Sequence, residues 1–329
     1  MKSTAIANAN IALVKYWGKR DNKLLLPFNS SISMTCEGLT TTTTVEFSDK
    51  YKKDQIIIND EELKKDEKNV IEHLNRIRKR AGIIKKAKVV SESNFPIAAG
   101  LASSASGFAA LTLAASKALG MDLGERELSI LARQGSGSAA RSISEGFVEW
   151  HKGEKKDGSD SYAYTIAGKK YWHEFRMLVT IVKEEKKKLS SRAGMQKTVE
   201  TSPYYKGWLE DVEEDLENLK KGISKRNFSA VGRISEDNCL KMHSLMLTTK
   251  PPIIYWMPET IKIIHEISAM RDEGIECYFT IDAGPNVKIL CLEKEEKKIT
   301  KRLLGMKEVK RIISTKPGEG VKLTDKHLF

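Results

Sequence analysis

A segment of small residues at 96–107 has the residue types best suited to phosphate chemistry. It reads Pro-Ile-Ala-Ala-Gly-Leu-Ala-Ser-Ser-Ala-Ser-Gly and runs into an alanine-rich stretch with helical character. Because Gly100 and the neighbouring serines carry little bulk, backbone N–H groups at the start of the helix can approach a polyphosphate closely. The segment lacks the ending of a Walker A loop and the GxGxxG spacing of a dinucleotide fingerprint. Close packing of a helix on a sheet is the other explanation for such small residues.

Charged side chains lie among small or apolar residues in three other segments. These segments are 9–20, which carries Lys15, Lys19 and Arg20, 135–142, which reads Gly-Ser-Gly-Ser-Ala-Ala-Arg-Ser, and 280–286, which reads Thr-Ile-Asp-Ala-Gly-Pro-Asn. The guanidinium of Arg141 can bind a carboxylate through two parallel hydrogen bonds, which an ammonium cannot do. Asp282 follows an apolar run and can present its carboxylate or cap the turn after it. The corresponding structural explanations are a surface salt bridge for Arg141 and a strand lysine that reaches solvent for Lys15.

Together with a fifth block, these segments resemble the diphosphomevalonate decarboxylase family of the GHMP kinase superfamily. The fifth block reads Ser-Ser-Arg-Ala-Gly-Met-Gln at 190–196, followed by Thr-Ser-Pro at 201–203. The blocks follow the family's order and spacing along most of the chain. The resemblance implies an α+β protein with the GHMP kinase fold, in which a ribosomal-S5-like N-terminal domain and a ferredoxin-like C-terminal domain enclose the active site in the cleft between them. We place these domains at 1–173 and 174–329.

The resemblance implies catalytic roles for four residues. Asp282 falls on the family's catalytic aspartate, which accepts or aligns the proton of the substrate's tertiary hydroxyl during transfer of the γ-phosphoryl group of ATP. Arg141 would hold the carboxylate that leaves as CO2, and Asn10 would orient that carboxylate or the hydroxyl. Lys15 would neutralise the charge that develops between the donor phosphate and the substrate.

Binding roles are implied as well. Lys19 and Tyr16 fall on residues that meet the phosphates of the substrate. The expected substrate-binding residues are Tyr16, Lys19, Ser136, Ser138, Ser190, Ser191 and Met195. The expected ATP-binding residues are Pro96, Ala98, Gly100, Leu101, Ala102, Ser103, Ser104 and Ser106. Ser104 is also the expected contact of the chain to Mg2+.

The implied enzyme carries out ATP-dependent decarboxylation of mevalonate 5-diphosphate to isopentenyl diphosphate, by phosphorylation of the C3 oxygen, loss of that phosphate and release of CO2. One departure from the family concerns the substrate. Where a helix before the Gly-rich loop supplies the family with an arginine for the diphosphate, this chain has Asn69, with Lys68, Arg76 and Arg78 as nearby cations. Mevalonate 5-phosphate, or mevalonate 3,5-bisphosphate decarboxylated without ATP, therefore stays open as the substrate. A mevalonate-type GHMP kinase that does not decarboxylate is a further alternative.

Length and composition limit the remaining possibilities. A chain of 329 residues favours two domains. Its formal charge of +12 raises the alternative of an S5-like RNA-binding protein. Because the lysines are spread through the chain and mixed with glutamates, as at 183–188, we expect solvated surfaces and no nucleic-acid partner. The four cysteines lack the spacing of a metal site, although a contact between Cys239 and Cys277 stays open.

The location and assembly of the protein are also expected from its sequence and its family. We find no run of 18 apolar residues and no signal segment at the N-terminus. A cytoplasmic enzyme without a membrane partner is therefore expected. The habit of the family suggests a homodimer.

Hydrophobic periodicity predicts the elements that position these residues. In the first domain, strands are expected at 3–16, 40–47, 54–58, 86–91 and 146–150, and helices at 67–80, 104–119 and 126–133. In the second domain, strands are expected at 175–182, 276–282, 287–292 and 309–314, and helices at 204–222, 226–246, 258–273 and 294–304. Residues 151–173 show little periodicity and are predicted to be a connector.

Overall fold

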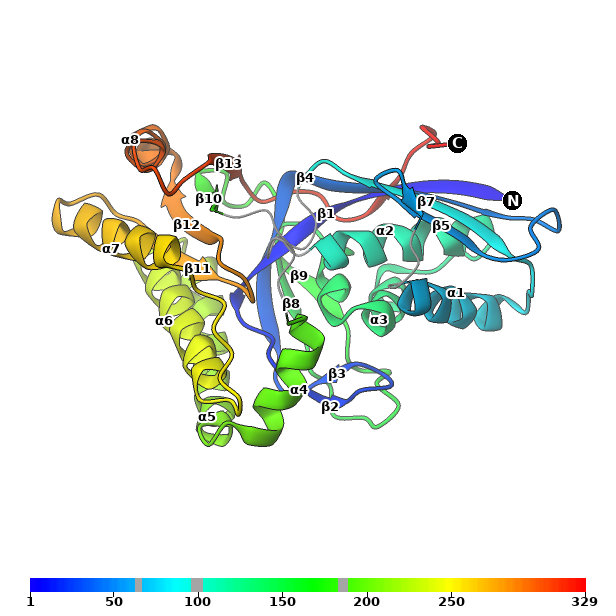
Figure 1. Ribbon diagram of the computed structural model, residues 1–329, viewed down its shortest axis with the longest axis horizontal. Coiled ribbons are helices and arrows are strands. Elements are labelled where there is room, and N and C mark those ends of the chain that lie inside the picture. Colours follow the sequence, from blue (N-terminus) through cyan, green and yellow to red (C-terminus); the bar gives the residue numbers. More distant parts are fainter. Residues whose placement is uncertain (63–66, 96–102, 183–188) are drawn as a thin grey trace.

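The computed structural model describes residues 1–62, 67–95, 103–182 and 189–329. In this part of the chain, two β-sheets are each covered by helices, and Figure 1 shows the larger sheet on the right and the smaller sheet on the left. A short hairpin of β2 (Lys19–Asp21) and β3 (Leu26–Pro27) extends below the larger sheet. The mixture of helices and sheets in two units confirms the predicted α+β class.

Two long antiparallel strands, β1 (Lys2–Val14) and β4 (Ser31–Phe47), form the centre of the larger sheet. Threonine is frequent in β4, and its branched side chain favours extended backbone. β4 is long enough to pair with β7 (Ala87–Ser93) along its C-terminal half and with β8 (Phe147–Trp150) near its start. The sheet is completed by β5 (Gln55–Ile58), β6 (Glu61–Glu62), β9 (Ala163–Ala167) and β14 (Lys322–Leu323).

Helices α1 (Glu67–Ala81), α2 (Ser103–Ala118) and α3 (Glu125–Gly135) pack with this sheet in one apolar core. The buried side of α2 carries Ala109, Ala110 and Ala114, whose small methyl groups let the helix lie close to the strands. After α3, the chain forms a short 3-10 helix, η1 (Gly137–Ser142). The alanine-rich helix therefore has the packing role that its small residues also suggest, while its first turn faces the centre of the molecule (Figure 1).

The smaller sheet has the strand order β11-β12-β10-β13. Its strands are β10 (Phe175–Ile181), β11 (Tyr278–Ile281), β12 (Val287–Leu292) and β13 (Arg311–Thr315). On one face, α7 (Pro258–Asp272) and α8 (Glu293–Leu304) bury Ile289 and its neighbours. On the other face, Met177 and Leu290 join a core that includes β1, α5 (Tyr205–Ser224) and α6 (Phe228–Leu247). This second core holds the two sheets together and brings β1 against β11.

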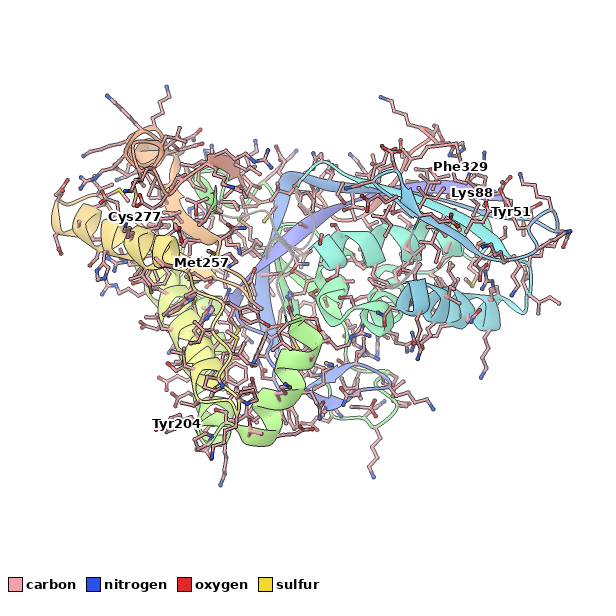
Figure 2. The ribbon with its side chains drawn as sticks, in the orientation of Figure 1. Tyr51, Lys88, Tyr204, Met257, Cys277 and Phe329 are labelled. Atoms are coloured by element: carbon pink, nitrogen blue, oxygen red, sulfur yellow. The ribbon has the colours of Figure 1, made fainter. Side chains whose placement is uncertain are left out.

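The end of the chain returns to the larger sheet. β14 pairs with β1, and the carbonyl of Phe329 accepts a 2.7 Å hydrogen bond from Lys2 Nζ. The ring of Phe329 also lies 4.2 Å from Lys88 Nζ, at the outer end of the sheet in Figure 2. The last residues thus lie with the first sheet, and the domain division at residues 173 and 174 stays a prediction.

Most predicted elements are present within a few residues of their expected bounds, but several features differ. The short strands β2, β3, β6 and β14 and the 3-10 helix η1 were not expected. β4 begins nine residues before the expected strand at 40–47, the expected connector contains β9, and α4 (Ser191–Thr201) was not expected. The early part of β4 does carry a strand signal, because the polar residues Ser31, Ser33 and Thr35 alternate with apolar ones, although the structure buries both sets. Among the described residues, no helix combines the length and the apolar character that crossing a bilayer requires.

Candidate active site

A cavity of about 500 Å³ lies between the two sheets and receives side chains from both. All four predicted catalytic residues and all seven predicted substrate-binding residues line it. From the first part of the chain these are Asn10, Lys15, Tyr16, Lys19, Ser136, Ser138 and Arg141, and from the second part Ser190, Ser191, Met195 and Asp282. The structure therefore brings together residues that are up to 272 positions apart, from Asn10 to Asp282, while their roles stay predictions.

Asp282 is placed at the centre of this cavity by the end of β11. The chain turns sharply after the strand, with the Gly284 N–H donating to the Asp282 backbone carbonyl at 2.7 Å. The side chain faces two lysines, with 2.8 Å from Oδ1 to Lys15 Nζ and 3.6 Å from Oδ2 to Lys288 Nζ. The carboxylate is thus presented to one cation that lines the cavity, Lys15, and to one that does not, Lys288.

The charges around Asp282 keep it ionised. Burial by itself raises the pKa of this carboxyl group, but the charges of Lys15 and Lys288, the Lys15 hydrogen bond and the charge of Arg141 outweigh burial and lower the pKa to about 2. At neutral pH, the group is therefore a carboxylate and a weak base.

Three hydrogen bonds fix the position of Lys15. Its backbone N–H donates to Asn238 Oδ1 in α6 at 2.7 Å, and its Nζ donates to the carbonyl of Ala12 and to Asp282, both at 2.8 Å. Only 1% of its side chain is exposed. Lys15 therefore does not extend to solvent, and its ammonium is fixed beside the carboxylate.

Arg141 is a buried cation next to Asn10. Its Nε donates to Asn10 Oδ1 at 3.1 Å and its Nη1 to Ser31 Oγ at 2.6 Å. Asn10 in turn donates to the Ser138 carbonyl at 3.0 Å, which orients the amide. Burial lowers the pKa of Arg141 to about 10, against the opposing charge of Asp282, so the guanidinium is charged at neutral pH. No carboxylate in the described part of the chain forms an ion pair with it, and this excludes the surface salt bridge.

The position of Arg141 depends on close packing around η1. A Cβ atom at Gly137 would lie 2.9 Å from ring atoms of both Tyr16 and Trp150. Those two rings pack edge to face at 4.7 Å, and the guanidinium of Arg141 lies 5.8 Å from the Trp150 ring. A glycine at this position lets η1 approach the aromatic pair, and burial raises the pKa of Tyr16, which keeps its hydroxyl protonated.

The other end of the cavity carries hydroxyls and further cations. Ser136 Oγ lies 3.5 Å from Ser138 Oγ, and Lys19 Nζ donates to Asn22 Oδ1 at 3.1 Å. Burial, followed by the nearby charge of Arg192, lowers the pKa of Lys19 to about 8. Such a cluster of donors is suited to an anion with several oxygens.

Arg192 joins this cluster from the second part of the chain. It belongs to the first turn of α4, which begins after Ser190 accepts a 3.3 Å hydrogen bond from the Ala193 N–H. Arg192 Nη1 donates to Asn69 Oδ1 at 2.6 Å and Nη2 donates to the Gly135 carbonyl at 3.3 Å. A guanidinium therefore lies where Asn69 replaces the expected arginine, although it comes from a different helix.

The predicted nucleotide residues are only partly within the described chain. Pro96, Ala98, Gly100, Leu101 and Ala102 lie outside the described residues. Ser103 and Ser104 begin α2 and line the cavity, where Ser136 Oγ lies 3.4 Å from Ser104 Oγ. Ser106 does not line it, because one turn along the helix its hydroxyl points to the sheet and lies 2.7 Å from Thr41 Oγ1.

Sequence reasoning missed two cations at this site. Lys288 lies within an apolar strand and gave no signal beyond a charged residue in a run of buried ones. Arg192 stands in the quoted block at 190–196, so its neighbours pointed to it, but no role was assigned. Both positions become evident only when the register of β12 and the direction of α4 are known.

Comparisons with known proteins give a consistent result. A family model for the diphosphomevalonate decarboxylase-like N-terminal domain matches residues 7–163, and one for the mevalonate 5-diphosphate decarboxylase C-terminal domain matches residues 177–315. The diphosphomevalonate decarboxylase of Ganoderma lucidum is 38% identical over 325 residues, covering 92% of this chain and 81% of the relative. That of Bos taurus is 39% identical over 310 residues, covering 88% and 76%.

Solved structures agree over nearly the whole chain. Mevalonate diphosphate decarboxylase from Staphylococcus aureus has a TM-score of 0.93 and 39% identity, with 98% of each chain covered. The enzyme from Enterococcus faecalis has a TM-score of 0.92 and 41% identity, with 99% of each chain covered. A structure described as MDDEF in complex with MVAPP, AMPPCP and magnesium has a TM-score of 0.93 and 42% identity, with 99% of each chain covered.

Proposed function

The chain belongs to the diphosphomevalonate decarboxylase family, and we propose that it converts mevalonate 5-diphosphate and ATP into isopentenyl diphosphate, CO2, ADP and phosphate. The observation that carries this proposal is the pairing, in one cavity, of an ionised Asp282 with a buried Arg141 that forms no ion pair with a carboxylate among the described residues. A carboxylate to align a hydroxyl and a guanidinium to hold a second carboxylate are the two groups that the reaction requires. ATP and Mg2+ fit the same family relationship.

In the first step, Asp282 aligns the tertiary hydroxyl of the substrate. Because the pKa of its carboxyl group is about 2, the carboxylate accepts a hydrogen bond from the hydroxyl and takes its proton only as the oxygen bonds to phosphorus. It passes this proton on to an oxygen of the transferred phosphoryl group, so that Asp282 is ionised again before the second step. The bond from the γ-phosphorus to ADP breaks as the new bond forms. The ammonium of Lys15, 2.8 Å from Asp282, stabilises the negative charge on the phosphoryl oxygens during this transfer.

In the second step, the C3–O bond breaks and the phosphate departs with the bonding electron pair. Positive charge develops at C3, and the carboxylate of Asp282 stabilises it across the cavity. The electrons of the bond between C2 and the carboxyl carbon then form the double bond, and CO2 leaves. Arg141, oriented by Asn10 and Ser31, holds the departing carboxylate in one plane.

We assign the diphosphate to the other end of the cavity. Lys19 and Arg192 would supply positive charge, and the hydroxyls of Tyr16, Ser136 and Ser138 would donate hydrogen bonds. Arg192 offers the guanidinium that is missing at Asn69, which supports a 5-diphosphate over a 5-phosphate as the substrate. Ser190, Ser191 and Met195 would bound the substrate on the α4 side.

Ser103 and Ser104 at the N-terminus of α2 would meet the phosphates of ATP, since their hydroxyls and the helix dipole favour anions. In the described part of the chain, no three His, Cys, Asp or Glu side chains gather as a metal site. A Mg2+ ion that is held mainly by phosphate oxygens, with the Ser104 hydroxyl as an oxygen ligand, fits this arrangement. When bound, it would neutralise phosphate charge.

Location and assembly are separate parts of the proposal. We infer a cytoplasmic homodimer without nucleic-acid or membrane partners. Sedimentation of the purified protein at several concentrations would measure its mass, and a monomer at micromolar concentration would contradict the dimer. Cell fractionation with an antibody to the protein would test the compartment.

The decisive assay supplies ATP and Mg2+ with one of three compounds and measures CO2 and ADP separately. The compounds are mevalonate 5-diphosphate, mevalonate 5-phosphate and mevalonate 3,5-bisphosphate. We expect equal amounts of CO2 and ADP from the 5-diphosphate and none when ATP is left out. ADP without CO2 would instead identify a kinase, and CO2 from the bisphosphate without ATP would identify a different decarboxylase.

A further inference from the structure

Lys288 is a buried lysine that the proposed reaction steps do not use. Its side chain has no exposed surface, and its Nζ lies 3.6 Å from Asp282 Oδ2. It is not among the residues that line the cavity. Since an isolated buried ammonium is costly, a lysine at such a position requires an explanation.

The register of the smaller sheet places this side chain. Lys288 of β12 stands opposite Thr280 of β11, and successive side chains of a strand point to opposite faces. Val287 and Ile289 enter the core beneath α7 and α8, so Lys288 points to the face that meets β1. On that face Thr280 Oγ1 donates to the carbonyl of Ala12 at 3.4 Å, which fixes the sheet against the strand that leads to Lys15.

Lys15 and Lys288 each lie next to a different oxygen of Asp282, but only Lys15 also lines the cavity. Lys15 lines the cavity, and in the proposed reaction it also stabilises the phosphoryl group. Arg141 also lines the cavity, and in the proposed reaction it binds the substrate carboxylate. Lys288 is fully buried and does not line the cavity, so a bound substrate does not contact its ammonium directly.

Resting on the proposed function, we propose that Lys288 is a positioning residue that keeps Asp282 charged and oriented while the anionic substrates fill the cavity. A diphosphate, a carboxylate and ATP bring several negative charges close to Asp282. Such charges favour protonation of a carboxylate, and a protonated Asp282 could neither align the hydroxyl nor stabilise positive charge at C3. The ammonium of Lys288, next to Asp282 Oδ2, opposes this protonation.

The other titratable groups around Asp282 do not replace this charge. Cys36 from β4 and Cys239 and His243 from α6 are the neutral neighbours. Burial raises the pKa of Cys36 to about 12 and that of Cys239 to about 11. Burial lowers the pKa of His243 to about 3. The cations that lower the pKa of Asp282 are therefore Lys15, Lys288 and Arg141. Burial lowers the pKa of Lys288 itself, and the charge of Asp282 opposes this and favours the ammonium.

The test replaces Lys288 with methionine, which has a similar length and no charge, and measures kcat against pH with saturating ATP, Mg2+ and mevalonate 5-diphosphate. We expect the acid limb of kcat to move upward by about 1–3 pH units, the shift that a charge at this distance produces. The KM for the substrate should change little because Lys288 does not line the cavity. The melting temperature of the ligand-free variant should fall, since removal of one partner of a buried ion pair leaves the Asp282 charge less well compensated.

Leu290→Ala is the matched control, because Leu290 lies two residues further along the same face of β12 and is fully buried. It should lower the melting temperature and leave the acid limb in place. Lys288→Gln is a second uncharged variant, which keeps a hydrogen-bond donor and should shift the limb in the same direction even if Lys288→Met does not fold. An unshifted limb in the folded Lys288 variants would overturn the inference. Absence of CO2 release by the wild-type protein would instead refute the proposed function.

Discussion

The centre of the cavity, around Asp282, and its phosphate end, around Lys19 and Arg192, are built differently. At the centre, Lys15 and Arg141 are almost fully buried, and their polar atoms bond to groups of the protein itself at 2.6–3.1 Å. At the phosphate end, Arg192 is exposed and Ser136 meets its neighbouring hydroxyls only at 3.4–3.5 Å. The central groups are therefore preorganised before substrate arrives. At the phosphate end, Arg192 is oriented by its 2.6 Å bond to Asn69 but is exposed, and the Ser136 hydroxyl can turn to a ligand.

This difference separates two roles. The groups at the centre take part in the chemical steps, and the groups at the phosphate end capture, that is bind, the substrate. A group that is fixed in place by the protein stabilises a transition state without reorganising during the reaction. A donor that exchanges a weak internal contact for a phosphate oxygen contributes mainly to binding. Substitutions at the centre should accordingly lower kcat, and substitutions at the phosphate end should raise KM.

The largest effect is expected for Asp282→Asn. The change keeps the shape of the side chain but removes the charge that Lys15 and Lys288 surround, so kcat should fall by about 10²–10⁴-fold. ATP affinity, measured by calorimetry, should be nearly unchanged. A variant with wild-type kcat would show that Asp282 takes no part in the reaction, and the proposed catalytic role of the centre would then be wrong.

Arg141→Lys should have the next largest effect. The charge is kept, but the planar two-point contact to the departing carboxylate is lost, and misorientation of this kind costs about 10²-fold in rate. KM should rise less, because the cations of the phosphate end still hold the substrate. If only KM changes, then Arg141 belongs with the capture groups, and the carboxylate must be held elsewhere.

The residues at the centre of the site could be predicted from the sequence, but their contacts could not. The motif residues Asn10, Lys15, Arg141 and Asp282 stand in short blocks with distinctive neighbours, and all four line the cavity. Their contacts were not predictable, because Lys15 and Asp282 are 267 positions apart and meet only through the packing of β1 against β11.

Lys288 and Arg192 show why the remaining residues were missed. A lysine in an apolar strand gives no indication of which face it points to, and only the pairing with Thr280 settles this for Lys288. Arg192 depends on α4, a helix whose sequence has few apolar residues at helical spacing and whose start is set by the Ser190 cap. The β9 strand is short and lies at the edge of the sheet, and its five residues carry too little periodicity to be recognised.

Arg192→Ala tests the capture side. Loss of charge-assisted hydrogen bonds to the diphosphate, each contributing about 1.5–3 kcal/mol, should raise KM by about 10–100-fold. The kcat at saturation should stay within about threefold of the wild-type value, because uniform binding is removed. Asn69→Leu, which removes only the partner of Arg192, is the graded control and should raise KM less. A large loss of kcat in Arg192→Ala would erase the proposed distinction between the two ends.

The smallest effect is expected in the pH dependence of substrate binding through Lys19. Its pKa of about 8 in the ligand-free protein means that it carries a charge below pH 8 and loses it as the pH rises. Binding of a diphosphate favours the charged form, so KM for the substrate should rise above this pH by at most about tenfold per pH unit. Lys19→Arg keeps its charge throughout this range and should flatten the rise. The KM for ATP, measured in parallel, should not follow the same limb. An identical pH profile in Lys19→Arg would show that another group titrates, and Lys19 would then not be the cation that sets the pH dependence of substrate binding.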